Sequence, residues 1–209
     1  MKICIYPGGF DPFHKGHADV IEQTAATLEM GEGDMFIIVP DVKAKKDSNT
    51  SLAQRCEIVR IASTELKEKV KSDIKVFDPY YHGITSGGGE HMKNVTLFVK
   101  EKRPDAVCYT IMGDDRFLAF KKKKSPALMQ NVVVVTRDET FDEVATAAST
   151  LPKKPTLVKG KLFGSSATKI RENISNKGGY DAISDCISLE TYDYIVNQGL
   201  YTENTKSIT

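Results

Sequence analysis

The stretch Tyr6-Pro7-Gly8-Gly9-Phe10-Asp11-Pro12-Phe13-His14-Lys15-Gly16-His17 joins a short apolar run, residues 3–6, to a segment with helical spacing. The apolar run is typical of a buried parallel strand, and the Pro-Gly-Gly after it indicates a tight exit turn. Gly8 and Gly9 have no Cβ, so a phosphate or a ribose can approach the backbone, and the amides at the start of the next helix favour bound anions. The stretch therefore predicts a strand, an anion-binding turn and a helix.

His14 and His17 are spaced i, i+3, so their imidazoles share one face of the predicted helix and both can point at one polyphosphate. Two other interpretations are a pair of exposed histidines at a helix start, and half of a metal site completed by His82 or His91. The glycine turn just upstream favours phosphate binding, and we expect no metal ligands here.

Beyond this stretch, short apolar runs alternate with helix-period segments, a pattern typical of β-α units on a parallel sheet. We expect strands at residues 2–6, 35–39, 74–77, 106–112 and 132–136, and amphipathic helices at 18–28, 52–66 and 93–102. This pattern predicts an α/β protein with a doubly wound parallel sheet. Ligands of such sheets bind beyond the carboxyl ends of the strands, where residues 8–17, 40–47 and 113–115 are expected to meet.

The chain has 209 residues, of which 40% are hydrophobic, enough for one sizeable core. We expect a single domain over residues 1–209, with residues 165–201 as its C-terminal helical part and 202–209 as a tail. The 29 basic and 28 acidic residues nearly cancel, which gives no support for nucleic acid or a membrane surface as partner. A small molecule is the favoured partner, and a homo-oligomer is left open.

Cysteine usage indicates a reducing compartment. The four cysteines lie far apart, without a Cys-x-x-Cys pair, and are expected to be reduced thiols. No apolar run approaches the length of a membrane span, and the N-terminal residues enter a strand rather than the apolar region of a signal peptide. We therefore expect a cytoplasmic protein.

Two segments resemble signatures of the nucleotidylyltransferase superfamily. Residues 10–17 resemble its (T/H)-x-G-H motif, and residues 164–171 resemble its I-S-S-T-x-I-R motif. The resemblance implies a Rossmann-like nucleotidylyltransferase fold with a C-terminal helical extension, in which His14 and His17 contact ATP phosphates. It also implies that Ser166, Thr168 and Arg171 grip the same phosphates. The alternative for this second segment is a purely structural role, as an ordinary helix N-cap with a solvent-exposed arginine.

The loop after the second expected strand carries Lys43, Lys45 and Lys46, and Ser51 to Arg55 resemble the S-L-x-x-R helix opening of related enzymes. The resemblance implies that one lysine of this loop reaches the phosphates. We assign Lys46 to the catalytic role, and Lys43 and Lys45 to substrate binding. A solvated loop is the alternative, because runs of charge usually face water.

Other nucleotide contacts are expected at Gly113, Asp115, Thr85 and Arg137. Gly113-Asp114-Asp115 resembles the G-x-D of the pyridine-nucleotide branch, whose aspartate holds nucleotide hydroxyls, and Asp115 is the favoured candidate. The alternative is an aspartate that caps a helix. Thr85 opens a glycine-rich loop on the acceptor side, and Arg137 ends an expected strand where either nucleotide can reach it. With Gly8, Gly9 and Phe10, these residues complete the expected binding set.

The acceptor is indicated by weaker resemblances. Residues 5–12 are similar to pantetheine-phosphate adenylyltransferases, whereas residues 111–117, 132–137, 166–171 and 194–201 are similar to nicotinate- or nicotinamide-mononucleotide adenylyltransferases. The chain departs from the latter by having no Trp and by lacking Pro-His-Lys in the second loop. The resemblance implies transfer of AMP from ATP, with Mg²⁺, to a pyridine mononucleotide in NAD biosynthesis. The alternatives are pantetheine-phosphate adenylyl transfer and a catalytically silent nucleotide-binding regulator.

Overall fold

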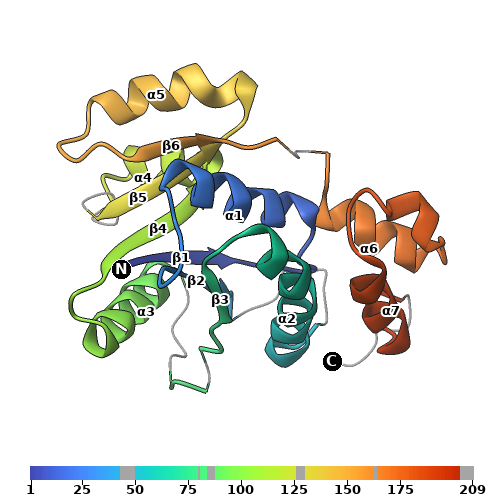
Figure 1. Cartoon of the computed structure of the whole chain (residues 1–209). Coiled ribbons are helices and arrows are strands. Elements are labelled where there is room, and N and C mark those ends of the chain that lie inside the picture. The colour runs from blue at the N-terminus through green and yellow to red at the C-terminus, as the bar shows by residue number, and fades with distance from the viewer. Residues whose placement is uncertain (43–49, 80, 84–87, 126–129, 162–163, 203–209) are drawn as a thin grey trace.

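The computed structural model describes residues 1–42, 50–79, 81–83, 88–125, 130–161 and 164–202. Its centre is a six-stranded parallel sheet with strand order β3-β2-β1-β4-β5-β6 (Figure 1). The order reverses between β1 and β4, which confirms the predicted doubly wound architecture. The strands are β1 (Lys2–Gly8), β2 (Met35–Pro40), β3 (Asp73–Val76), β4 (Val107–Gly113), β5 (Asn131–Thr136) and β6 (Thr156–Lys159).

Helices cover both faces of this sheet. They are α1 (Lys15–Thr27), α2 (Leu52–Lys69), α3 (Gly88–Lys102), α4 (Asp114–Lys122), α5 (Phe141–Ser149), α6 (Ala167–Ser175) and α7 (Leu189–Asn197), with single 3₁₀ turns η2 (Asp138–Thr140) and η3 (Tyr180–Ile183). In Figure 1, α6 and α7 lie side by side at one edge, next to α1 and α2. None of the described helices is both long and apolar enough to cross a membrane.

Alternate residues of each central strand enter different cores, because successive side chains of a strand point to opposite faces. Cys4 and Tyr6 of β1 pack in the cluster that includes Ile21 of α1. Ile3 and Ile5 pack in the cluster on the other face, with side chains of α3. Burial on both faces explains the near-continuous apolar runs in the sequence.

The five expected strands are present with boundaries shifted by at most two residues, and two further elements were not expected. Strand β6 extends the sheet beside β5, and helix α5, which precedes β6 in the chain, covers that end of the sheet (Figure 1). Strand β6 has only four residues, and Val158 is the one that is buried, so its pattern is weak in the sequence. All four cysteines are buried and unbridged, as expected of reduced thiols.

Candidate functional site

The first motif forms the connection from β1 to α1. His14 is the N-cap of α1 and His17 lies in the first turn, and their rings stack with centroids 3.8 Å apart. The backbone N–H of His14 donates to Nδ1 of His17 over 3.2 Å. Since Nδ1 accepts this hydrogen bond, the neutral His17 ring carries its proton on Nε2.

Phe10 holds the His17 ring in place. Its ring centroid lies 5.0 Å from that of His17 in an edge-on arrangement, and its side chain is buried. A Cβ on Gly8 would come within 2.8 Å of the Phe10 ring, so the missing side chain at Gly8 makes room for this ring. Gly9, by contrast, has open space where a Cβ would be. Gly9 lies in the wall of a cavity described below, and a phosphate contact at Gly8 stays a prediction.

The connection bends sharply at Phe10, whose φ of 45° lies in the left-handed region that non-glycine residues rarely adopt. The carbonyls on either side of Phe10 are both held by arginines. Arg55 Nη1 donates to Gly9 O over 3.0 Å, and Arg171 Nη1 donates to Asp11 O over 2.7 Å. Two cations from distant helices thus maintain this conformation.

The second motif forms the start of α6. Ser166 is the N-cap, and its Oγ lies 3.5 Å from the backbone N of Lys169, which donates to it. Residues 165–168 face His14 and His17 across a cavity of about 290 Å³ whose wall also includes residues 9–11. The structure therefore brings the two motifs together around one space. Arg171 lines neither this cavity nor its neighbour, and donates instead to Asp11 O and to Thr168 Oγ1, the latter over 3.3 Å.

A second cavity of about 520 Å³ adjoins the first, and His14, His17, Ser165 and Ser166 belong to both walls. It lies at the carboxyl ends of β1, β4 and β5, where the strand order reverses. Ligands of doubly wound sheets bind at this position. The adjoining spaces can accommodate a nucleoside in the larger cavity and its phosphates in the smaller one. A groove of about 840 Å³ between α4 and α5, lined in part by Lys121, is remote from both motifs.

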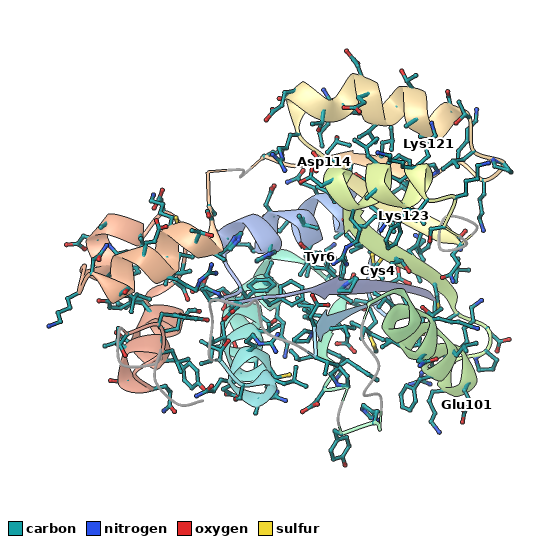
Figure 2. All side chains as sticks on the ribbon, turned by 180° about the vertical axis from the view of Figure 1, so that it is seen from behind. Cys4, Tyr6, Glu101, Asp114, Lys121 and Lys123 are labelled. Atoms are coloured by element: carbon teal, nitrogen blue, oxygen red, sulfur yellow. The ribbon has the colours of Figure 1, made fainter. Side chains whose placement is uncertain are left out.

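Asp114, rather than Asp115, belongs to the wall of the larger cavity, together with Gly113 and Arg137. Asp114 is buried, and its Oδ2 accepts a hydrogen bond of 2.7 Å from Thr140 Oγ1 and lies 3.5 Å from Arg137 Nε. Asp115 is 86% exposed and pairs with Arg137 Nη2 over 3.2 Å. One residue along a helix turns a side chain by about 100°, so Asp114 lines the cavity while Asp115 lies at its exposed side, and the nucleotide role of Asp115 stays a prediction. Figure 2 labels Asp114 at the start of α4 and Tyr6 on β1.

Lys43, Lys45, Lys46 and Thr85 lie outside the described residues. The residues before the three lysines are nevertheless fixed by Arg55, which donates to Asp41 O over 2.7 Å. Sequence reasoning gave no role to Arg55. The one sequence feature that pointed to a role was its place in the S-L-x-x-R helix opening. An arginine on a helix is otherwise expected to face solvent.

Sequence reasoning also missed Asp11. Its buried Oδ1 accepts hydrogen bonds from Thr50 Oγ1 over 2.6 Å and from Tyr201 OH over 2.7 Å. The available sequence signal for a buried carboxylate was an acidic residue within a run of aromatic and glycine residues. The partners of that carboxylate come from remote parts of the chain and leave no local pattern.

Comparison with known proteins agrees with this geometry. A probable nicotinate-nucleotide adenylyltransferase of Flavobacterium psychrophilum is 26% identical over 204 residues, which cover 96% of this chain and 99% of that protein. A phosphopantetheine adenylyltransferase of Desulforamulus reducens is 26% identical over 180 residues, covering 86% of this chain and 99% of that one. The solved structure of Plasmodium falciparum nicotinic acid mononucleotide adenylyltransferase complexed with APC superposes with a TM-score of 0.75 at 22% identity, covering 96% of each chain, and so supports the fold.

The sequence model of the cytidylyltransferase-like family matches residues 5–173, which include both motifs, the second half of β1 and the other five strands of the sheet. With the two motifs facing one cavity at the switch point of the sheet, the chain belongs to the cytidylyltransferase-like family.

Proposed function

We propose that this nucleotidyltransferase transfers the AMP moiety of ATP to the phosphate of nicotinate mononucleotide, giving the dinucleotide of NAD biosynthesis and pyrophosphate. The observation that carries the proposal is the cavity shared by His14 and His17 with residues 165–168. Ring nitrogens, hydroxyls and the amides of a helix start are groups that bind phosphates. The relatives' names support adenylyl transfer over other nucleotidyl transfers.

The polyphosphate would lie between the starts of α1 and α6. Because Nδ1 of His17 accepts a hydrogen bond, its Nε2–H is the donor for a phosphoryl oxygen. Ser166 and Thr168 would add hydroxyls on the opposite wall. Arg171 would act through the positive field of its guanidinium and through the carbonyl that it holds. Lys46 remains the proposed mobile cation for the leaving phosphates, with Lys43 and Lys45 on the substrate side.

The reaction needs no covalent enzyme intermediate, because the acceptor phosphate is itself an anionic nucleophile. One of its oxygens attacks the α-phosphorus of ATP, the bond from that phosphorus to the bridging oxygen breaks, and pyrophosphate leaves. Catalysis would depend on in-line alignment and on neutralising the charge of the α-phosphate and the leaving group. Hydrogen bonds from His14 and His17 would strengthen as that charge develops.

The residues of the site fit Mg²⁺ brought in by the nucleotide. Within the described part of the chain, no three His, Cys, Asp or Glu side chains cluster as a metal cage. Asp11 lines the smaller cavity, and its Oδ2 is buried without a hydrogen-bond partner among the described residues. Mg²⁺ typically keeps several waters and binds phosphates with one or two carboxylates. Asp11 is therefore the residue that would hold the hydrated ion, which would supply further neutralisation of the phosphates.

The larger cavity would bind a nucleoside, with Gly113, Asp114 and Arg137 in its wall and Thr85 proposed on the acceptor side. Burial raises the pKa of the Tyr6 hydroxyl, so this wall residue stays protonated and uncharged. A nicotinate acceptor is favoured over phosphopantetheine because the nicotinate-nucleotide relative matches 96% of the chain and the phosphopantetheine relative 86%.

The test is release of pyrophosphate from ATP and Mg²⁺ with nicotinate mononucleotide, nicotinamide mononucleotide or phosphopantetheine supplied separately. Nicotinate mononucleotide should give the highest kcat/KM. A preference for phosphopantetheine would refute the proposed acceptor and leave adenylyl transfer standing. Binding of ATP without release in any of the three reactions would favour the silent regulator.

A further inference from the structure

Asp11, in the wall of the smaller cavity, joins three distant parts of the molecule through its carboxylate and its backbone carbonyl. Its Oδ1 accepts from Thr50, just after the segment that carries the three lysines, and from Tyr201 near the C-terminus. Its backbone carbonyl accepts from Arg171 of α6. Asp11 is 3% exposed, so each of these bonds forms away from water, where an unmet polar group is costly.

The backbone after α7 turns so that the Tyr201 hydroxyl reaches the Asp11 carboxylate. Gly199 has a φ of +60° and Leu200 N donates to Ile195 O over 3.0 Å, so the chain turns back on the end of the helix. Leu200 and Tyr201 are both buried. The Tyr201 hydroxyl lies 2.7 Å from Asp11 Oδ1, and the phenol is the donor of this hydrogen bond.

We propose that Tyr201 is a positioning residue for adenylyl transfer, which holds the loop of residues 9–11 against the polyphosphate through its hydrogen bond to Asp11. The inference rests on the proposed function. Asp11 follows Phe10, whose left-handed backbone must be held from both sides. Without the Tyr201 hydroxyl, Thr50 would be the one remaining donor to a carboxylate whose Oδ2 already has no partner among the described residues.

A shift of the loop would reach the reacting groups directly. Residues 9–11 share the cavity wall with His14 and His17, and Phe10 packs on the His17 ring. Misplacement of a reacting group by about 1 Å can cost about 100-fold in rate. The substrate contacts themselves would be retained, so the effect should appear in kcat more than in the KM for ATP.

The experiment compares Tyr201→Phe with Tyr192→Phe. Each replacement removes one hydroxyl from the C-terminal part, but Tyr192 OH donates over 3.3 Å to Gly178 O, away from the loop. We expect kcat to fall about tenfold in Tyr201→Phe and to change less than about twofold in Tyr192→Phe, with the KM for ATP similar in both. The double variant Tyr201→Phe/Thr50→Val should lose less than the product of the single losses, because both hydroxyls bind the same oxygen.

Hydrogen exchange of the peptide that spans residues 9–17 supplies a readout that does not depend on turnover. Exchange should be faster in Tyr201→Phe than in the wild type, and unchanged in Tyr192→Phe. Equal kcat values for Tyr201→Phe and wild type, or a lower kcat without faster exchange in this peptide, would overturn the inference. If the wild type releases no pyrophosphate with any acceptor, the proposed function fails. Hydrogen exchange still tests the inference in that case, because equal exchange in Tyr201→Phe and wild type would refute Tyr201 as the support of this loop.

Discussion

Arg55→Met removes a buried cation that holds the loop of residues 9–11 and the chain after β2 through backbone carbonyls. Arg55 is 0% exposed, and its Nη1 donates to Gly9 O over 3.0 Å and to Asp41 O over 2.7 Å. Methionine has an unbranched chain that can retain much of the packing of the arginine stem, so the main change is loss of the guanidinium. Both carbonyls then lack the donor that Arg55 supplied to them.

The expected loss in the free energy of unfolding follows from these two hydrogen bonds. A hydrogen bond from a charged donor contributes about 1.5–3 kcal/mol. Two such bonds give an upper range of about 3–6 kcal/mol, and the desolvation energy recovered by removing a buried cation reduces the total. We therefore expect the free energy of unfolding to fall by about 3 kcal/mol. The contact of Nη2 with Val42 O is 3.5 Å long and adds little to this value.

The assay is equilibrium unfolding in urea, with Arg60→Met as the matched control. Arg60 lies on the same helix, but its side chain is 50% exposed and its ion pair with Glu57 spans three residues at the surface. This control should change stability by no more than about 0.5 kcal/mol. A loss below about 1 kcal/mol in Arg55→Met, or equal losses in the two variants, would refute the claim that the guanidinium supports the loop.

Three further predictions concern the site and its surroundings. His17→Ala should lower kcat for pyrophosphate release by roughly 100-fold with an unchanged far-ultraviolet circular dichroism spectrum, and undiminished turnover would remove the ring from the mechanism. Gly8→Ala should cost about 1–3 kcal/mol in urea unfolding, because its Cβ would lie 2.8 Å from the Phe10 ring, whereas an unchanged midpoint would mean that the ring can move aside. For Asp34, burial is outweighed by hydrogen bonds from two backbone N–H groups and by nearby positive charge, which together hold the carboxyl pKa below its ordinary value. The carboxylate therefore stabilises the fold above about pH 4, and this stabilisation is lost as the pH falls. Asp34→Asn should cost stability at pH 7 and progressively less toward pH 3, whereas a cost independent of pH would contradict the reasoning.

The strands were predictable because burial on both faces leaves a direct mark on the sequence. Residues 131–136 have five buried positions in six, so the run is apolar almost throughout. Strand β6 is short and lies at the edge of the sheet, and its burial pattern resembles that of a loop. Periodicity was therefore sufficient for the centre of the sheet and insufficient at its edge.

Side-chain roles were less predictable than element positions. Asp114 and Asp115 are equivalent in composition and adjacent in sequence, and only the direction of α4 separates a cavity wall from an exposed ion pair. Arg55 looked like an ordinary helical cation, yet it is among the largest fully buried side chains. Its partners are carbonyl groups, and a carbonyl carries no residue identity that a sequence pattern could reveal.

The sequence by itself determined the strand-turn-helix unit of residues 2–27 and the pairing of His14 with His17, because residues a few positions apart are held together by the backbone geometry of a single helix. The tertiary structure decided how that unit meets the rest of the chain. Arg171 reaches Asp11 across 160 positions, and Tyr201 reaches it across 190. Such contacts depend on where the strand order reverses and on how helices pack across the sheet, and local preferences encode neither.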